Sequence, residues 1–214
     1  MTSFARYYKD KKLEEVSMDK MEELIRNKNN KVEIAEHVYE RLYTRFLKIF
    51  DFGTDQEIDC TKNGQEEWID IFKKEYKNGF LILASCSLLI ETFAAFLTGE
   101  NETPRGESPN RFNKVFEYAK DKKSPLNIFE NSEYYRAIRC GILHQGETKG
   151  KFLVTREKEK KILDGKIINA YLFHVALKKL LISYKSDLEN KEWNSWIWDA
   201  CRQKIRHIIA NSRD

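Results

Sequence analysis

An arginine and a histidine in the second half of the chain are the residues best suited to chemistry. Arg139 and His144 are separated by four residues. Arginine is a fixed cation that can hold a phosphate through two parallel hydrogen bonds, and histidine exchanges a proton near neutral pH. Together they are the two parts that a metal-free ribonuclease needs. The same spacing also occurs in helices that do no chemistry, where it is only an exposed arginine and a histidine at the helix end. The surrounding elements must therefore decide whether the pair is catalytic.

The pair lies in a predicted helix of roughly four turns that starts near Asn131 and ends at Gly146. Asn131 and Ser132 are favourable N-cap residues, and a glycine often ends a helix at its C-terminus. Arg139 lies off the face that we expect to be buried, and Gly141 on that face would let another helix approach closely. The spacing of three and four residues assigns to this face Tyr134, Ile138, Gly141 and Ile142.

The two functional side chains of this helix diverge if the helix is straight. Five residues separate their positions by about 140° around the axis and roughly 7.5 Å along it. One straight helix therefore cannot aim both at the same atom. Either the last turn bends, or two copies of the helix pack so that Arg139 of one chain meets His144 of the other.

Composition narrows the class of protein. The 214 residues are enough for one fairly large domain, and 38 basic against 34 acidic side chains give a formal charge of +4, which allows a basic patch but is no polycation. No apolar run follows the first basic residues, so we expect no secretory signal and a cytoplasmic location. Reduced thiols and no disulfide framework are expected from four widely spaced cysteines, Cys60, Cys86, Cys140 and Cys201.

The most apolar segment, 80–97, contains one charged residue, Glu91. Its 18 residues are the minimum for a membrane span, but a charge at its centre would be costly and the flanks lack an aromatic belt. We therefore predict a helix buried on nearly all sides at the centre of a bundle, and no membrane association. Glu91 should then need a partner, and we expect it to face Arg136 or Arg139. The alternative is an exposed carboxylate at a gap in the packing.

The rest of the chain predicts a mainly α fold, an up-and-down helical bundle formed by a single domain over 1–214. Residues 1–12 are expected to be a loose N-terminal segment, and 51–65 and 99–111 to be loops. A small β-hairpin is predicted near 151–166. Apolar periodicity predicts further helices over 13–27, through 35–49, and over 65–77, 112–120, 169–188 and 194–210.

Other kinds of catalytic site are poorly supported by the sequence. The four histidines are far apart with no HxxxH or HExxH spacing, so no metal or other cofactor is predicted. No glycine-rich phosphate loop or GxSxG elbow occurs. Cys140 and His144 share a helix face at four-residue spacing, which allows a thiolate–imidazole pair, but a buried cysteine that behaves as a small hydrophobic residue is the commoner case.

The central helix resembles the signature helix of a known group of proteins. The segment RCGILHQGE, preceded by YYRAI, is similar to the motif helix of the HEPN superfamily, in which an arginine is followed after four to six residues by a histidine. The apolar segment ASCSLLIETFAAF resembles the buried helix that precedes this motif. The segments KIINAYLFHVALKKLL and WIWDACRQKIRHII resemble the closing helices of a HEPN-like family of bacterial and plasmid-encoded proteins. The resemblance covers about residues 30–210.

The resemblance implies a HEPN-like bundle that forms a homodimer, with both motifs lining one composite active site. It further implies a metal-independent endoribonuclease that cleaves RNA by transesterification through the 2′-OH. Such proteins act as toxins or defence effectors, so an antitoxin protein is a further expected partner. The residues that match the motif, and to which the resemblance assigns catalytic roles, are Arg139 and His144 only. Beside them we expect Glu91, Cys140 and Gln145 as supporting residues, and Arg136, which falls outside the spacing of the motif, as a candidate RNA contact.

One position departs from the pattern of the family. Active members usually carry a polar residue such as Asn, Asp or His directly after the arginine, where this chain has Cys140. A thiol orients its neighbours less well than an amide or a carboxylate. The alternative is therefore a non-catalytic HEPN-like dimer that binds RNA or a protein partner, and a third hypothesis is a structural interaction protein.

Overall fold

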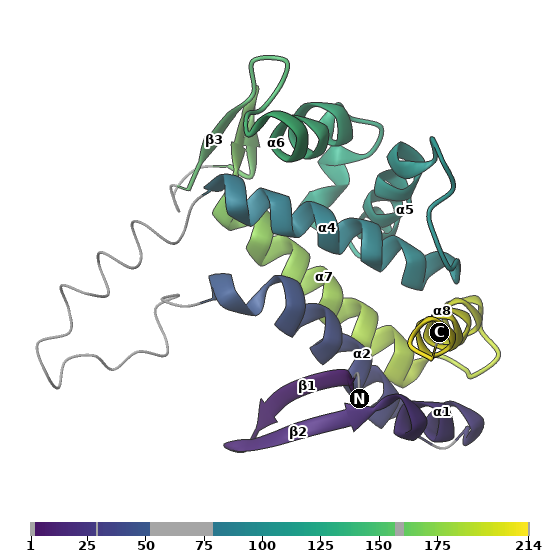
Figure 1. Cartoon of the computed structure of the whole chain (residues 1–214). Coiled ribbons are helices and arrows are strands. Elements are labelled where there is room, and N and C mark those ends of the chain that lie inside the picture. Colours follow the sequence, from purple (N-terminus) through teal and green to yellow (C-terminus); the bar gives the residue numbers. More distant parts are fainter. Residues whose placement is uncertain (1–2, 29, 52–78, 157–160, 214) are drawn as a thin grey trace, which may run out of the picture.

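The computed structural model describes residues 3–28, 30–51, 79–156 and 161–213 of the chain. Within these ranges the fold is mainly helical, as predicted, with two small sheets (Figure 1). The α-helices are α1 (Met18–Arg26), α2 (Lys31–Phe46), α4 (Gly79–Thr98), α5 (Ser108–Asp121), α6 (Cys140–Gln145), α7 (Ala170–Asn190) and α8 (Trp196–Asn211). Shorter helical turns are η1 (Lys48–Phe50), η2 (Pro125–Phe129) and η3 (Tyr135–Arg139). The strands are β1 (Ser3–Lys9), β2 (Lys12–Ser17), β3 (Leu153–Thr155), β4 (Leu163–Asp164) and β5 (Ile167–Asn169).

Helix α4 is the central element, and it packs against α2, α5, α7 and α8. Its covered faces carry bulky residues with no exposed surface, such as Phe93 and Phe96. The expectation that it is buried on nearly all sides is confirmed apart from Leu81 and Leu88, which are 54% and 43% exposed. These two leucines lie seven residues apart, so they mark one stripe along α4 that no described element covers.

Helix α4 is also the one described helix that is long and apolar enough to cross a membrane by length and composition. Most of its apolar segment, 61%, is buried inside the protein. Core helices of water-soluble proteins have the same two properties, so this observation is weak evidence for a span.

The two closing helices, α7 and α8, agree with the predicted ranges. Apolar residues of α7 at helical spacing, including Phe173 and Leu177, are fully buried. The indole of Trp198 in α8 donates a hydrogen bond of 2.8 Å to the carbonyl oxygen of Leu188 near the end of α7. A buried indole N–H needs such a partner, and here the bond also fixes the turn between the two helices.

The N-terminal segment is a β-hairpin, which corrects the prediction of a loose segment over 1–12. Strands β1 and β2 pair antiparallel, and the helix expected over 13–27 begins only at Met18 because the residues before it form β2. Asp10 and Lys11 join the strands with φ angles of 49° and 62°. Two positive φ angles are typical of the tight type I′ hairpin turn, which usually contains glycine or asparagine. The Asp-Lys sequence therefore did not signal a turn.

The hairpin is held to α2 by burial and by polar contacts, among them one between Tyr7 and His37. Phe4, Ala5 and Tyr7 of β1 are buried. The hydroxyl of Tyr7 lies 3.0 Å from Nδ1 of His37 in α2. The hairpin lies along α2 at the edge of the bundle (Figure 1).

The second sheet also differs from the simple hairpin predicted near 151–166. Strand β5 lies in the middle, parallel to β3 and antiparallel to β4, in the order β3-β5-β4. Ile168 of β5 is fully buried, which explains why β5 takes the central place. The predicted helix over 65–77, and all but the first residue of the loop over 51–65, lie outside the described residues.

Candidate functional site

The motif helix is not the regular helix that its sequence predicts. Asn131 has a φ angle of 53° and lies outside the helix, and the hydroxyl of Ser132 accepts a hydrogen bond of 3.2 Å from the backbone N–H of Tyr134. The first turn, η3, is a π turn over Tyr135–Arg139, and α6 follows it. The predicted end is confirmed, because Gly146 adopts a left-handed φ of 69°.

The π turn leaves one carbonyl oxygen for a contact outside the helix. In a π turn the hydrogen bonds run from residue i+5 to residue i, as in the bond from the N–H of Cys140 to the oxygen of Tyr135. The oxygen of Ala137 accepts a bond of 2.8 Å from the N–H of Lys149, beyond the end of α6. The chain that follows the motif therefore folds back onto it.

Gly141 makes this return possible. A Cβ atom at Gly141 would lie 2.5 Å from the carbonyl oxygen of Glu147 and 3.1 Å from the backbone nitrogen of Lys149. The sequence predicted a close approach at Gly141 but assigned it to another helix. The approaching element is the segment 147–149, a loop of the same chain. Tyr134 and Ile138 of the predicted buried face are buried as expected, whereas Ile142 is half-buried.

Glu91 of α4 and Arg139 of η3 form an ion pair, as the isolated charge of α4 predicted. Nη2 of Arg139 lies 3.1 Å from one carboxylate oxygen of Glu91 and 3.2 Å from the other. The side chains are only 19% and 20% exposed. Burial of the guanidinium opposes its charge, but the hydrogen bond to Glu91 and the negative charge of Glu91 outweigh it and raise the pKa of Arg139. Arg139 is thus a permanently charged group held in one position.

Tyr135 is a neighbour of this pair that the sequence did not single out. The guanidinium carbon of Arg139 lies 5.5 Å from the centre of the Tyr135 ring, within the range of a cation–π contact. Burial raises the pKa of Tyr135, the neighbouring Cys140 thiol adds to this effect, and the Ser108 hydroxyl opposes it. Cys140 is half-buried. The one signal in the sequence was that Tyr135 precedes Arg139 by four residues, which places the two side chains on one side of an α-helix.

One polar atom of Arg139 has no partner. Its Nε is buried and donates no hydrogen bond to any of the described residues. A buried donor without a partner costs free energy. The contacts to Glu91 use Nη2, so the Nε edge of the guanidinium is left with capacity for a further acceptor.

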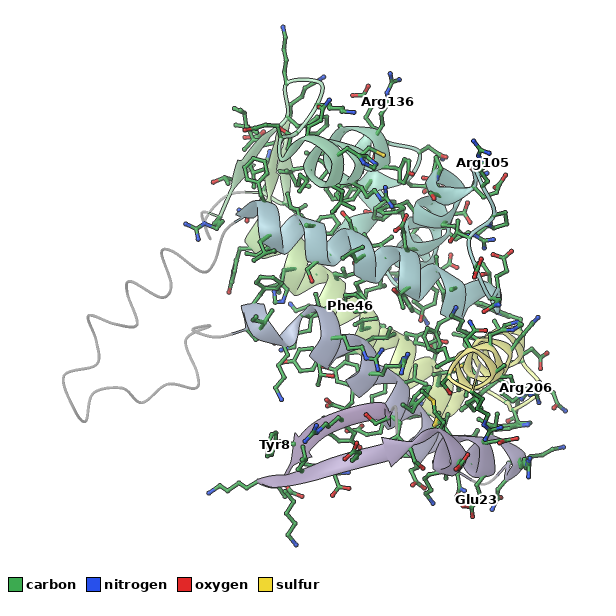
Figure 2. The ribbon with its side chains drawn as sticks, in the orientation of Figure 1. Tyr8, Glu23, Phe46, Arg105, Arg136 and Arg206 are labelled. Carbon is green, nitrogen blue, oxygen red and sulfur yellow. The ribbon has the colours of Figure 1, made fainter. Side chains whose placement is uncertain are left out.

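His144 lies on a different side of the motif helix from this cluster. Its side chain is exposed, and no described residue makes a hydrogen bond or an ion pair with it. Gln145 is exposed beside it. Arg136 is exposed as well and points away from the protein at the top of Figure 2. Of the two arginines expected near Glu91, the partner is therefore Arg139.

Two pockets adjoin the start of the motif helix. The smaller, with a volume of ≈ 160 Å³, is lined by aromatic side chains including Tyr135 and by the amides of Asn113 and Asn131. The larger, ≈ 430 Å³, shares these two amides and continues along α5. The amide nitrogen of Asn113 donates to the side-chain oxygen of Asn131 at 3.0 Å, and the oxygen of Asn113 accepts from the backbone of Asn131 at 2.9 Å. Both amides are thus oriented before any ligand arrives.

The arrangement offers a phosphate-binding cation and a proton-transfer group on one short helix, and within the described ranges no three His, Cys, Asp or Glu side chains gather as a metal site would require. Comparisons of the chain with models of protein families, with curated proteins and with solved structures find no match.

Proposed function

We propose that the protein is a metal-independent endoribonuclease of the HEPN type. The observation that carries the proposal is the pair of Arg139, charged and held by Glu91 below the surface, and His144, exposed five residues later. The resemblance of the motif to HEPN proteins names the substrate as RNA. The same resemblance places the protein among cytoplasmic toxins or defence effectors, with an antitoxin as a second partner.

In the proposed transesterification His144 and Arg139 have different roles. His144 takes the proton of an RNA 2′-OH, which then attacks the adjacent phosphorus, and Arg139 stabilises the charge that develops on the phosphate oxygens. The bond between the phosphorus and the 5′ oxygen breaks, and this oxygen takes a proton from His144 of the other protomer. The products are a 2′,3′-cyclic phosphate and a 5′-OH end. Exposed Arg136 is placed to contact a neighbouring phosphate.

The ion pair with Glu91 is compatible with this role of Arg139. A guanidinium carries five N–H donors, and the contacts with the carboxylate use one nitrogen, Nη2. A group that is already oriented loses little conformational entropy when substrate binds. Glu91 is therefore a positioning residue in this proposal.

The proposed active unit is a homodimer with a composite site. Arg139 faces α4 whereas His144 faces solvent, so the two side chains diverge within one chain. A two-fold axis near the motif helices would bring Arg139 of one protomer to His144 of its partner. The exposed Leu143, between the two motif residues, supports a contact surface here, because its side chain is apolar and 39% exposed.

A non-catalytic dimer that binds RNA or a protein is the second candidate. Cys140 favours it, because a thiol is a weak hydrogen-bonding group at a position where active HEPN proteins carry a stronger one. In this case the oriented amides of Asn113 and Asn131 would serve to bind unpaired bases without cleavage.

The experiment that tests the proposal is cleavage of mixed RNA substrates in EDTA by wild type and by His144→Ala. We expect the wild type to produce cyclic-phosphate ends and the variant to bind RNA without cutting it. His207→Ala, a change of the same type on α8, is the control and should cut as wild type does. If wild type leaves all RNAs intact but binds them, the second candidate replaces the first. Equal cutting by His144→Ala would refute the assigned mechanism.

A further inference from the structure

A group of cations lies where the N-terminal hairpin meets α2, away from the motif helix. Arg41 and Arg45, one turn apart on α2, both direct a guanidinium nitrogen to the backbone oxygen of Phe4. The contact of Arg41 is the shorter, and that of Arg45 is long, at 3.5 Å. The guanidinium of Arg41 also lies 4.8 Å from the centre of the Phe4 ring. Two like charges thus converge on a single neutral atom.

The fold explains why Arg41 contacts the backbone oxygen of Phe4, but it does not explain the second contact, from Arg45. The strand register shifts between Ser3 and Ala5, so Phe4 lies at an irregularity of the hairpin and its oxygen needs a donor from elsewhere. Arg41 supplies this donor. One guanidinium is enough for one carbonyl oxygen, and Arg45 adds only a weak contact at the cost of repulsion between two cations.

Lys204 of α8 adds a third cation to the group. Its amine donates a hydrogen bond of 2.7 Å to the backbone oxygen of Asn101, after the end of α4. Burial and the charge of Arg41 both lower the pKa of Lys204, while exposed Glu102 acts in the opposite direction. The charge of Arg41 on α2 thus acts on the amine of Lys204 on α8.

No described carboxylate forms an ion pair with any of the three cations, and the hydrogen bonds that they donate go to backbone oxygens. Burial, and then the charge of Arg45, lower the pKa of Arg41 to about 9. Burial also lowers the pKa of Arg45. Arg41 and Lys204 are half-buried, whereas Arg45 is exposed. In contrast, Arg111, Arg139 and Lys185 each have a carboxylate partner. Partly buried charges are usually paired, so this group lacks its counter-ion.

We propose that Arg41, Arg45 and Lys204 form a binding site for a phosphate group, separate from the Arg139–His144 motif. A phosphate offers several strong acceptor oxygens and up to two negative charges, and two arginines with a lysine are the side chains that bind it best. Its charge would offset the repulsion that the free protein bears. In Figure 1, α6 lies above α4 whereas α2 and α8 lie below it, so the two sites are on different sides of the central helix.

The test uses inorganic phosphate as the probe and the double variant Arg45→Gln, Lys204→Gln, which leaves Arg41 to hold Phe4. Thermal unfolding is followed in chloride buffer, with and without phosphate at constant ionic strength. The matched control is Arg206→Gln, Lys12→Gln, which removes the same charge from exposed positions; Arg206 points outward on α8 in Figure 2.

We expect phosphate to raise the melting temperature of wild type and control, and to leave that of the double variant unchanged, because ligand binding stabilises only the protein that has the site. Without phosphate the double variant should be as stable as wild type or more so, since like charges are removed. An equal phosphate effect in wild type and double variant would overturn the proposal. A large loss of stability of the double variant in chloride would also overturn the proposal, because Arg45 and Lys204 would then stabilise the fold without a ligand.

A second arm identifies the source of the phosphate. Binding of a single-stranded RNA oligonucleotide is measured at several salt concentrations in the His144→Ala background, which separates this site from cleavage. If the site holds an RNA backbone, the double variant binds the oligonucleotide more weakly. The slope of the logarithm of its association constant against the logarithm of the salt concentration is then less negative by about 0.7 for each lost phosphate contact. If the oligonucleotide binds as before while the phosphate effect is lost, the ligand is a small phosphate compound.

Discussion

Glu91 on the central helix and Arg139 on the π turn of the motif helix are joined by contacts of 3.1 and 3.2 Å. This ion pair links the most apolar element of the protein to the residue with the clearest chemical role. It lies where water has limited access, so its removal should cost more than that of a surface pair.

Substitution of Glu91 should destabilise the protein through Arg139. Glu91→Ala leaves the guanidinium partly buried without a counter-ion, and we expect a loss of about 1.5–3 kcal/mol in the free energy of unfolding. Arg139→Met in the Glu91→Ala background should recover part of this loss, because no unpaired charge remains. Urea denaturation measures both. The control, Glu117→Ala, breaks the exposed pair with Lys114 and should cost under about 1 kcal/mol. Equal losses in the two single variants would contradict the expectation.

Gly141→Ala distinguishes this structure from a regular motif helix. Helix propensity alone predicts a gain of about 1 kcal/mol when alanine replaces a glycine inside a helix. Here the new Cβ would lie 2.5 Å from the backbone oxygen of Glu147. We therefore expect destabilisation of about 1–3 kcal/mol, as for other overpacked sites. Chemical denaturation gives the sign, and a gain in stability would show that the segment 147–149 does not pack on the motif.

A mixing experiment tests the composite active site. Arg139→Ala and His144→Ala should each be inactive as homodimers. Refolded together, half of the dimers carry one copy of each chain, and in these one of the two sites has an intact Arg139 from one protomer and an intact His144 from its partner. Two-fold symmetry sets an upper limit of about a quarter of the wild-type rate, and the recovered rate should lie below it because the mixed dimer lacks the second His144 that protonates the 5′ oxygen. If both residues act within one chain, no mixture regains activity.

The contact between the hairpin and α2 should weaken in mild acid. Burial lowers the pKa of His37, against the opposing effect of Glu33. The folded protein therefore keeps this histidine neutral while the unfolded chain takes up a proton below about pH 6.5. Stability is complete above that pH and falls as the pH decreases toward the lowered pKa, by at most about 1.4 kcal/mol per pH unit.

Unfolding at pH 7.5 and 5.5 measures this effect. His37→Gln keeps a hydrogen-bonding partner for Tyr7 but cannot titrate, so its stability should change less between the two pH values than that of wild type. His207→Gln should behave as wild type. If His37→Gln has the full wild-type dependence, the histidine is not the group responsible.

The sequence by itself determined the elements with long apolar periodicity and one contact between them. Helices α4, α7 and α8 follow from apolar residues repeated at helical spacing, because such a face can be buried only against other elements. The partner of Glu91 followed from the cost of an unpaired charge in an apolar helix, which left Arg136 and Arg139 as candidates.

Only the tertiary structure decided the features that depend on distant residues. The π turn at Tyr135–Arg139 and the close approach at Gly141 arise because the segment 147–149 returns to the motif helix, and no local propensity encodes that return. The hairpin needs the surface of α2 to bury Phe4 and Tyr7. Packing also selected Arg139 over Arg136 as the partner of Glu91, and it brought Arg41 and Arg45 of α2 to the backbone oxygen of Phe4 in the hairpin.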